Sequence, residues 1–511
     1  MKEMMLAAPV FLPLAGGAAL LALSGRQREK DGPAVRIISG VFTLGVSLVI
    51  FWLLNRSPKD SLVLFRLYGS LTVKFQMDPM GSVFLGLIGF LWPLATLYAF
   101  EYMKYEERKP AFFAYYLMTY GITAGIALAG NLVTLYLFYE MLTLVTFPLV
   151  LHPMTKEAQR ASRKYLYYSI SGAAFAFIGL VFLLSYSATG TTEFIAGGNL
   201  NMEAARGQKN LLLLAYILAF FGFGVKAALF PVHGWLPKAT VAPTPVTALL
   251  HAVAVVKSGA FAILRLTYFS YGTEFLKGTW AQWAVLSATI ITIAFGSTMA
   301  VREIHWKRRL AYSTISNLSY ILFGAALMSP LGIMASLCHL MAHAFMKICS
   351  FFCAGAVIHQ TGKTFVYELD GLGKRMPVTF ACLTVASLSL MGIPLFAGFI
   401  SKWNLIHGAF SLGTGWTKGM GRILPFMGAG VILYSALMTG IYMLTVLVRA
   451  YFPKDTSGGP DRTETEENIS DPGWRMLLPL MVFAAVILLM GIKPEVFLQM
   501  DRLRQIGGTI G

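Results

Sequence analysis

The stretch FFGFGVKAALFPVHGWLP, residues 220–237, places a lysine in the middle of an apolar run. Glycines precede Lys226 and Pro231 follows it, so residues that interrupt helices lie on both sides of the cation. A lysine in such a run needs a different explanation in a soluble core than in a membrane. The composition of the whole chain decides between these two settings.

The chain has the composition of a membrane protein. Of its 511 residues, 56% are hydrophobic and only 13% are charged, with a mean hydropathy of +0.65. Soluble domains carry about 25% charged residues. A spanning helix takes about 20 apolar residues, and about fourteen such runs occur, at residues 4–24, 36–54, 79–100, 111–130, 132–151, 165–188, 210–231, 242–268, 280–300, 309–328, 331–358, 377–400, 425–449 and 475–492. The sequence therefore predicts an all-α polytopic membrane protein.

The net charge of +17 has two readings, a nucleic-acid partner or cytoplasmic loops rich in lysine and arginine. The second fits better, because basic residues concentrate in alternate loops. One such loop contains Lys156, Arg160, Arg163 and Lys164, and another contains Arg302, Lys307, Arg308 and Arg309. We therefore expect a multi-pass protein of the cell membrane with no nucleic-acid partner. Both termini should then lie on the outer side.

The segments between the runs offer little room for chemistry. Residues 55–78 alternate in polarity and predict a small hairpin on the outer surface, whereas residues 450–474 predict a flexible cytoplasmic loop. There is no glycine-rich nucleotide loop and no haem-type cysteine pair. The four cysteines lie in apolar runs without metal-ligand spacing and are interpreted as packing residues: Cys338, Cys349, Cys353 and Cys382. We expect no cofactor, no metal and no self-contained enzyme.

Ionisable residues inside the apolar runs are the candidate functional residues. Moving a charge to the bilayer centre costs at least about 2.5–3.5 kcal/mol, so such residues are functional hypotheses. They are Glu140, Lys226, His251, Lys257, His339, His343, Lys347 and Lys402. The alternative is that long side chains extend to the membrane surface. That reading suits Arg265 and Glu101, near the ends of runs, but not Lys257 or Lys347, which long apolar segments flank on both sides.

The spacing of three of these residues adds a second argument. His339, His343 and Lys347 recur every four residues and so share one helix face. A stripe of titratable groups is typical of a proton relay. A zinc site is the rival interpretation, because two histidines at this spacing also suit a metal, but no acidic third ligand stands beside them.

Lys226 and Lys402 both lie where a helix is expected to be broken. Gly392, Pro394 and Gly398 precede Lys402, as Gly222 and Gly224 precede Lys226. Two broken helices at matching places in two halves indicate the ion site of a transporter built from inverted repeats. We therefore predict three initial helices in 1–110, one five-helix repeat in 111–270 and a second in 271–453. Residues 454–511 then hold the cytoplasmic loop, the last helix and a short tail.

Four motifs resemble one protein family. FPVHGWLPKATVAPTPVTALLHAVAVVKSGAF, KRRLAYSTISNLSYI, MAHAFMKICSFF and GIPLFAGFISKW are similar to the antiporter-like subunits of respiratory complex I, Mrp-type sodium/proton antiporters and membrane-bound energy-converting hydrogenases. The resemblance covers roughly residues 80–450. The short C-terminal tail and the lysine at position 402 make the chain most similar to the shorter Mrp D-type subunit.

The resemblance implies fourteen helices, two inverted repeats and a polar axis through the bundle. It assigns Glu140 and Lys226 to a coupled pair, His251 and Lys257 to a central relay, His343 and Lys347 to its continuation, and Lys402 to the exit. It further implies membrane partner subunits, with iron–sulfur or hydrogenase subunits in a redox-driven complex. Two functions stay open, a redox-driven proton pump and a cation/proton antiporter driven by ion gradients. A scaffold with relic polar residues is a third reading, disfavoured because every key position is occupied.

Overall fold

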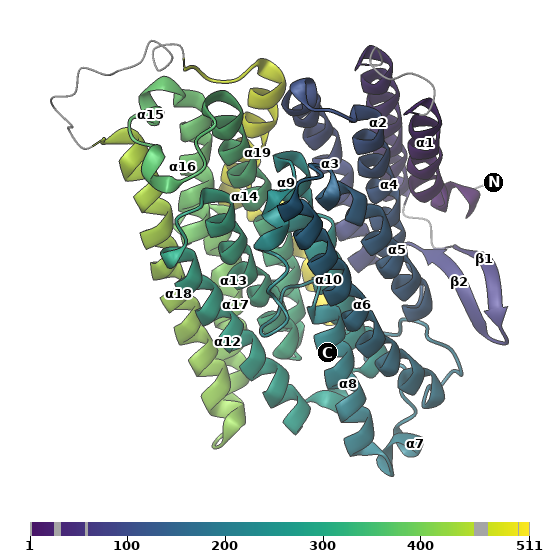
Figure 1. Ribbon diagram of the computed structural model, residues 1–511. Coiled ribbons are helices and arrows are strands. Elements are labelled where there is room, and N and C mark those ends of the chain that lie inside the picture. Colours follow the sequence, from purple (N-terminus) through teal and green to yellow (C-terminus); the bar gives the residue numbers. More distant parts are fainter. Residues whose placement is uncertain (1–2, 25–31, 57–59, 454–468, 499, 510–511) are drawn as a thin grey trace.

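The computed structural model is a bundle of long helices that run side by side (Figure 1). It describes residues 3–24, 32–56, 60–453, 469–498 and 500–509. The helices are α1 (Ala8–Ser24), α2 (Gly32–Arg56), α3 (Pro79–Tyr102), α4 (Lys109–Ala127), α5 (Leu132–Leu151), α6 (Lys156–Ser185), α7 (Met202–Arg206), α8 (Lys209–Gly224), α9 (Thr244–Ala252), α10 (Val255–Arg265), α11 (Thr273–Leu276), α12 (Trp280–Arg302), α13 (Trp306–Ala326), α14 (Pro330–Thr361), α15 (Leu372–Arg375), α16 (Pro377–Met391), α17 (Ala397–Thr414), α18 (Met420–Tyr451), α19 (Trp474–Ile492), α20 (Pro494–Phe497) and α21 (Met500–Gly508).

Several of these helices are long and apolar enough to cross a membrane. Within the described residues, nine helical stretches meet both criteria, and α1, α8 and α16 are shorter apolar helices. The prediction of a mainly helical, multi-pass membrane protein is confirmed. The number of spans and the inverted repeats stay predictions.

Polar side chains fix where individual helices begin. Asp78 accepts a hydrogen bond from the backbone N–H of Gly81 at 2.7 Å and so caps the start of α3. Ser329 does the same for Gly332 at the start of α14, at 3.1 Å. Each cap satisfies a backbone donor that has no partner within its helix, which matters most where water is scarce.

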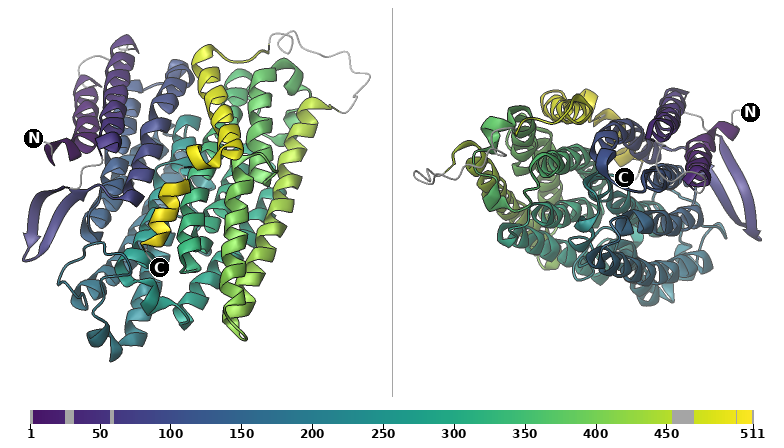
Figure 2. Two further views of the ribbon diagram at one scale, coloured as in Figure 1. Left: turned by 180° about the vertical axis from the view of Figure 1, so that it is seen from behind. Right: turned by 45° about the horizontal axis from the view of Figure 1, so that its top comes forward.

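Two helical segments form the centre of the bundle. In the apolar 18-residue stretch of α14, 94% of the residues are buried inside the protein. The share is 100% for the corresponding stretch of residues 244–271 and only 33% for that of α2. The tilted view in Figure 2 shows the first half of the chain and the second half as neighbouring groups of helices. Helix α19 packs against α3, α14 and α16 and so joins the two groups. Most candidate residues lie on these central helices.

The predicted hairpin is present. Strands β1 (Ser61–Tyr68) and β2 (Leu71–Gln76) pair antiparallel, with Ser61 opposite Gln76. Lys74 ties the hairpin to a distant loop through an ion pair with Glu193 at 2.5 Å. Figure 1 shows the hairpin projecting from the side of the bundle, with α7 at one end of the bundle and α15 at the opposite end. Most of the predicted 450–474 loop, residues 454–468, lies outside the described residues.

Candidate functional site

Three helix interruptions lie next to candidate residues. Helix α8 ends at Gly224, two residues before Lys226. Helices α16 and α17 are separated by residues 392–396, shortly before Lys402. The third interruption separates α9 from α10, between His251 and Lys257. Both expected breaks are therefore present, and the structure adds a third at Val253, where the sequence has no glycine or proline.

Gly222 has a different role from the one predicted. It lies within α8, and a Cβ atom there would come within 2.5 Å of the backbone nitrogen of Ala176. The residue therefore allows α8 to approach α6 closely and does not itself break the helix. Beyond α8, the indole nitrogen of Trp235 donates to the carbonyl oxygen of Val225 at 2.7 Å and holds the irregular segment in place.

The predicted pair of Glu140 and Lys226 is formed. The Lys226 Nζ lies 3.9 Å from a carboxylate oxygen of Glu140. It also donates to the carbonyl oxygen of Tyr139 and lies 3.3 Å from the centre of that tyrosine ring. Lys226 is fully buried, whereas 28% of the Glu140 side chain is exposed. The ammonium is thus held inside the bundle, and its counter-charge stands at the edge.

Lys257 and His343 join two central helices. The Lys257 Nζ is hydrogen-bonded to Nδ1 of His343, across α10 and α14. The rings of His343 and His339 lie 5.7 Å apart, and Nδ1 of His339 is 2.9 Å from the Ser401 hydroxyl. Ser401 immediately precedes Lys402. These contacts connect Lys257 with the neighbourhood of Lys402, and the predicted shared face of the two histidines is observed.

Lys347 and His251 are not joined directly to this chain of contacts. The Lys347 Nζ donates to the Ser313 hydroxyl at 2.5 Å and to the Leu310 carbonyl oxygen at 3.3 Å, both on α13. His251 packs against the Phe351 ring at 4.9 Å, and neither of its ring nitrogens has a hydrogen-bond partner among the residues that the structure describes. Both side chains are fully buried.

Lys402 lies against the break that precedes it. Its Nζ donates to the carbonyl oxygens of Leu390 at 2.6 Å and Met391 at 3.1 Å, at the C-terminal end of α16. Helix C-termini carry unpaired carbonyls and partial negative charge, so a cation is stabilised there. Gly392 follows with a φ of +88°, a conformation that favours glycine. The lysine and the broken helix therefore form one structural unit.

Arg265 does not extend to the membrane surface as predicted. Only 1% of its side chain is exposed, and its guanidinium binds both carboxylate oxygens of Asp78. The side chain is surrounded by aromatic rings, with Phe194 at 4.7 Å. Asp78 and Arg265 stand 187 positions apart, so the sequence contains no local signal of this pair. Glu101, the other residue read this way, forms an ion pair with Arg475 at 3.4 Å.

Two basic residues of the predicted cytoplasmic loop after α12 are buried. The Lys307 Nζ donates to the carbonyl oxygen of Ala242 at 2.9 Å, and Nη1 of Arg309 donates to that of Tyr442 at 3.0 Å. Sequence reasoning treated both as topology signals. Their partners are backbone carbonyls, one just before α9 and one within α18, so the types of the partner residues give no signal of these contacts.

The comparisons with known proteins agree on one family. Residues 129–428 match the family described as NADH:quinone oxidoreductase/Mrp antiporter, TM. The chain is 30% identical over 436 residues to NADH-quinone oxidoreductase subunit N of Desulforudis audaxviator, with 83% of this chain and 82% of that protein covered. The chain belongs to this family.

Further relatives include antiporter subunits. The chain is 30% identical over 497 residues to a probable K⁺/H⁺ antiporter subunit of Rhizobium meliloti, covering 96% of this chain but only 47% of that longer protein. It also matches a chain in the structure of the Mrp complex from Dietzia with a TM-score of 0.79, covering 100% of both chains at 22% identity. At that identity the structural match establishes the shared fold alone.

Proposed function

We propose that this chain is a proton-translocating membrane subunit of a multi-subunit complex, using the axis from Glu140 and Lys226 through Lys257 and His343 to Lys402. The observation that carries the proposal is the contact between the Lys257 ammonium and the His343 ring, fully buried at the centre of the bundle. Two titratable groups in hydrogen-bond contact can exchange a proton, and such groups are rare in membrane interiors unless they serve ion transfer. Membership of a family that includes oxidoreductase and antiporter subunits supports the same role.

The coupled pair would start the transfer. While Glu140 is close, it favours the charged form of Lys226, because an opposite charge stabilises an ammonium. When Glu140 moves away, the desolvated ammonium is disfavoured and its proton passes inward toward Lys257. Glu140 suits this motion, since 28% of its side chain is exposed and its buried Oε1 makes no hydrogen bond within the described residues that would hold it in place. A charge on a neighbouring subunit would control the movement.

Water would complete the axis. Four buried ring nitrogens at or beside the axis have no hydrogen-bond partner within the described residues, namely both of His251 and Nε2 of His339 and of His343. A buried polar atom without a partner costs about 1–3 kcal/mol, and internal water commonly removes that cost. These unpartnered nitrogens, on histidines at or beside the axis, support a hydrated proton relay.

The architecture we propose is that of the sequence prediction. It has fourteen spans, with one repeat in residues 111–270 and a second in 271–453, in the cell membrane with both termini outside. The breaks before Lys226 and Lys402 support two related halves, since each lies in the corresponding part of its half. The third break, at Val253, then occurs in the first repeat and has no counterpart among the two matching breaks.

The partner subunits would distinguish a redox-driven proton pump from a cation/proton antiporter driven by ion gradients. A redox-driven complex would contain iron–sulfur or hydrogenase subunits, whereas a gradient-driven antiporter would contain antiporter-like and small hydrophobic subunits only. The test is to purify the intact complex through a tag, identify its subunits by mass spectrometry and measure proton uptake in proteoliposomes with and without sodium. Redox subunits together with sodium-independent uptake would support the pump, and their absence with sodium-dependent uptake would support the antiporter. Absence of proton movement under either driving force would refute the proposed function.

A further inference from the structure

A second set of buried polar groups lies beside the proposed axis, on α12, α13 and α18. Lys347 donates to the Ser313 hydroxyl at 2.5 Å, and that hydroxyl is 2.5 Å from the hydroxyl of Tyr442. The Tyr442 hydroxyl in turn donates to the Thr439 hydroxyl at 3.2 Å. At most 1% of each of these residues is exposed. The Lys347 ammonium, beside the axis, is thus hydrogen-bonded to the first of a row of buried hydroxyls.

One turn farther along α18, a tighter cluster joins three helices. The Ser435 hydroxyl is 2.5 Å from that of Ser297 and 2.9 Å from that of Ser316, and those two lie 2.7 Å apart. The Tyr320 hydroxyl donates to Ser435 at 2.7 Å. All four residues are buried. Each hydroxyl can both donate and accept, which is what proton transfer along a row requires.

Tyr320 lies between this cluster and Lys402, the proposed exit residue. Its ring lies 5.1 Å from the ring of His339, and the Lys402 ammonium lies 5.5 Å from the centre of the tyrosine ring. The hydroxyls therefore connect the surroundings of Lys347 with those of Lys402 without using His339. Two steps lack a direct contact between titratable or hydroxyl groups. Thr439 donates to the backbone oxygen of Ser435 at 2.7 Å, and the Lys402 ammonium lies 5.5 Å from the centre of the Tyr320 ring, so the step between Tyr320 and Lys402 also needs a bridging water. Residues one helical turn apart have Cβ atoms about 5–6 Å apart, which one water molecule can bridge.

We propose that these hydroxyls form a second proton route, parallel to the histidine route, from Lys347 through Ser313 and Tyr442 to Tyr320 and Lys402. The inference rests on the proposed function. In each transfer, the Ser313 oxygen takes a proton from the Lys347 ammonium and passes its own hydroxyl proton to the Tyr442 oxygen. Every hydroxyl gains one proton and loses one, so it ends neutral, and it rotates back before the next transfer. No oxidant or reductant takes part.

The competing explanation is that the hydroxyls only hold the helices together. Hydrogen bonds between membrane helices stabilise their packing, and a row of them would add to that stability. That role does not require the row to start at an ammonium and end beside another. A test must therefore measure proton transfer separately from stability.

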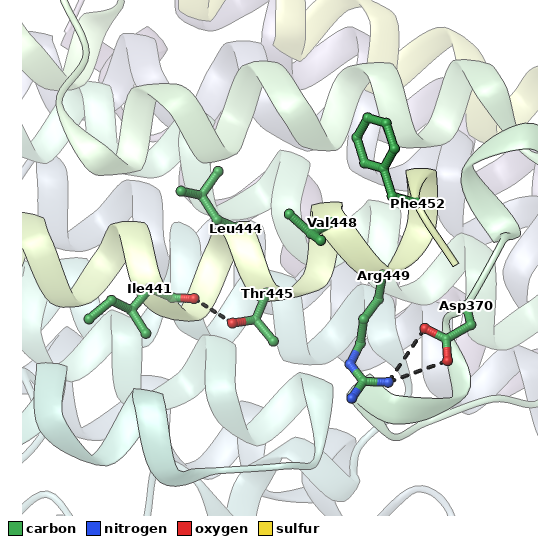
Figure 3. A pocket seen from close by; sticks show the side chains of 7 residues that line it. All are labelled: Asp370, Ile441, Leu444, Thr445, Val448, Arg449 and Phe452. Carbon is green, nitrogen blue, oxygen red and sulfur yellow. Dashed lines mark hydrogen bonds and ion pairs between the residues drawn. The ribbon is translucent and has the colours of Figure 1, made fainter. Parts of the chain in front are cut away.

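The outer face of α18 supplies matched controls. Figure 3 shows Thr445 on the groove of about 400 Å³ that also includes Ile441 and Val448, and Thr445 donates to the Ile441 carbonyl oxygen at 2.6 Å. Thr439 makes the same type of bond on the buried face. Tyr434 likewise matches Tyr442, since its hydroxyl bonds the Thr298 hydroxyl of α12 at 2.8 Å but belongs to a partly exposed side chain.

The experiment compares proton uptake by the reconstituted complex, measured with a pH-sensitive dye and normalised to assembled complex. The variants are Tyr442→Phe, His339→Ala and the two combined, with Tyr434→Phe and Thr445→Val as controls. Parallel routes predict partial loss in each single variant and loss to the leak rate in the combination. The controls should match the wild-type rate, and the thermal midpoint of Tyr442→Phe should resemble that of Tyr434→Phe.

Two outcomes would overturn the second route. In the first, the combined variant transports protons as fast as His339→Ala alone, so Tyr442 carries nothing. In the second, Tyr442→Phe alone falls to the leak rate, so the hydroxyls lie in series with the histidines. Failure of the wild-type complex to transport at all would instead refute the proposed function, which keeps the two claims separable.

Discussion

At Lys226, a single ammonium is shared by three groups of α5: the Tyr139 carbonyl oxygen, the Tyr139 ring and the Glu140 carboxylate. Only the carboxylate carries a full charge and only it reaches the edge of the bundle. Changing Glu140 therefore removes the charge that stabilises protonated Lys226, whereas the contacts of Lys226 with Tyr139 remain.

We expect Glu140→Ala to abolish proton uptake while assembly stays largely intact, because the variant removes the switching charge and not a packing group. Glu140→Asp should keep partial activity, since its charge survives with a shorter reach. Uptake in proteoliposomes, together with the yield of assembled complex, checks both. Wild-type uptake by Glu140→Ala would contradict the role of the pair.

Lys402 should require a titratable side chain. Lys402→Met retains most of the apolar stem but cannot hold a proton, so uptake should fall to the leak rate. Lys402→Glu should retain measurable uptake if transfer depends on titration, although it loses the bonds to the α16 carbonyls. Equal loss in both variants, accompanied by poor insertion, would mean that Lys402 has only a structural role.

At the scale of elements, the start of α17 packs directly on the end of α16. A methyl group at Gly398 would overlap the carbonyl oxygen of Ser389. Gly398→Ala should therefore force the two half-helices apart and destabilise the protein by about 1–3 kcal/mol. Gly430→Ala is the control, because that helical position has nothing within 4 Å. A lower thermal midpoint for Gly398→Ala alone is expected, and equal midpoints would contradict the account of this break.

The sequence reveals breaks only where the residues themselves interrupt a helix. Gly392 and Pro394 indicate the gap before Lys402, as Gly224 and Pro231 do near Lys226. The gap at Val253 has no such residue: Ala254 donates to the Leu249 carbonyl oxygen at 2.9 Å, one residue farther than an α-helix allows. A local pattern of glycine and proline cannot predict a distortion that occurs without them.

The hydrogen-bond partners of the candidate residues also cannot be predicted from the local sequence pattern. The isolation of Lys257 in an apolar run marks it as functional, and its burial follows from that pattern. The Lys257 ammonium is hydrogen-bonded to His343, whereas Lys347, on the same helix as His343, is hydrogen-bonded to Ser313. These pairings depend on how α10, α13 and α14 cross. The serines, threonine and tyrosines of the hydroxyl row on α12, α13 and α18 carry no charge, so they do not stand out from an apolar run as a lysine does.

At the scale of the whole molecule, opposite ends of the bundle should face opposite sides of the membrane. Glu203 of α7 and Lys374 of α15 are exposed at these two ends. We expect a membrane-impermeant maleimide to label Glu203→Cys in intact cells, and Lys374→Cys only after lysis. The four native cysteines are buried and should give little background. The reverse labelling pattern would invert the proposed orientation.

The central claim is that protons cross this chain through its buried axis, and Lys257 is the group in the middle of it. The most direct test is the initial rate of proton uptake by the reconstituted complex carrying Lys257→Met, compared with Lys238→Met in the exposed part of the segment before α9. We predict that Lys257→Met falls to the leak rate with normal assembly, whereas Lys238→Met transports like the wild type. Wild-type uptake by an assembled Lys257→Met complex would contradict the account.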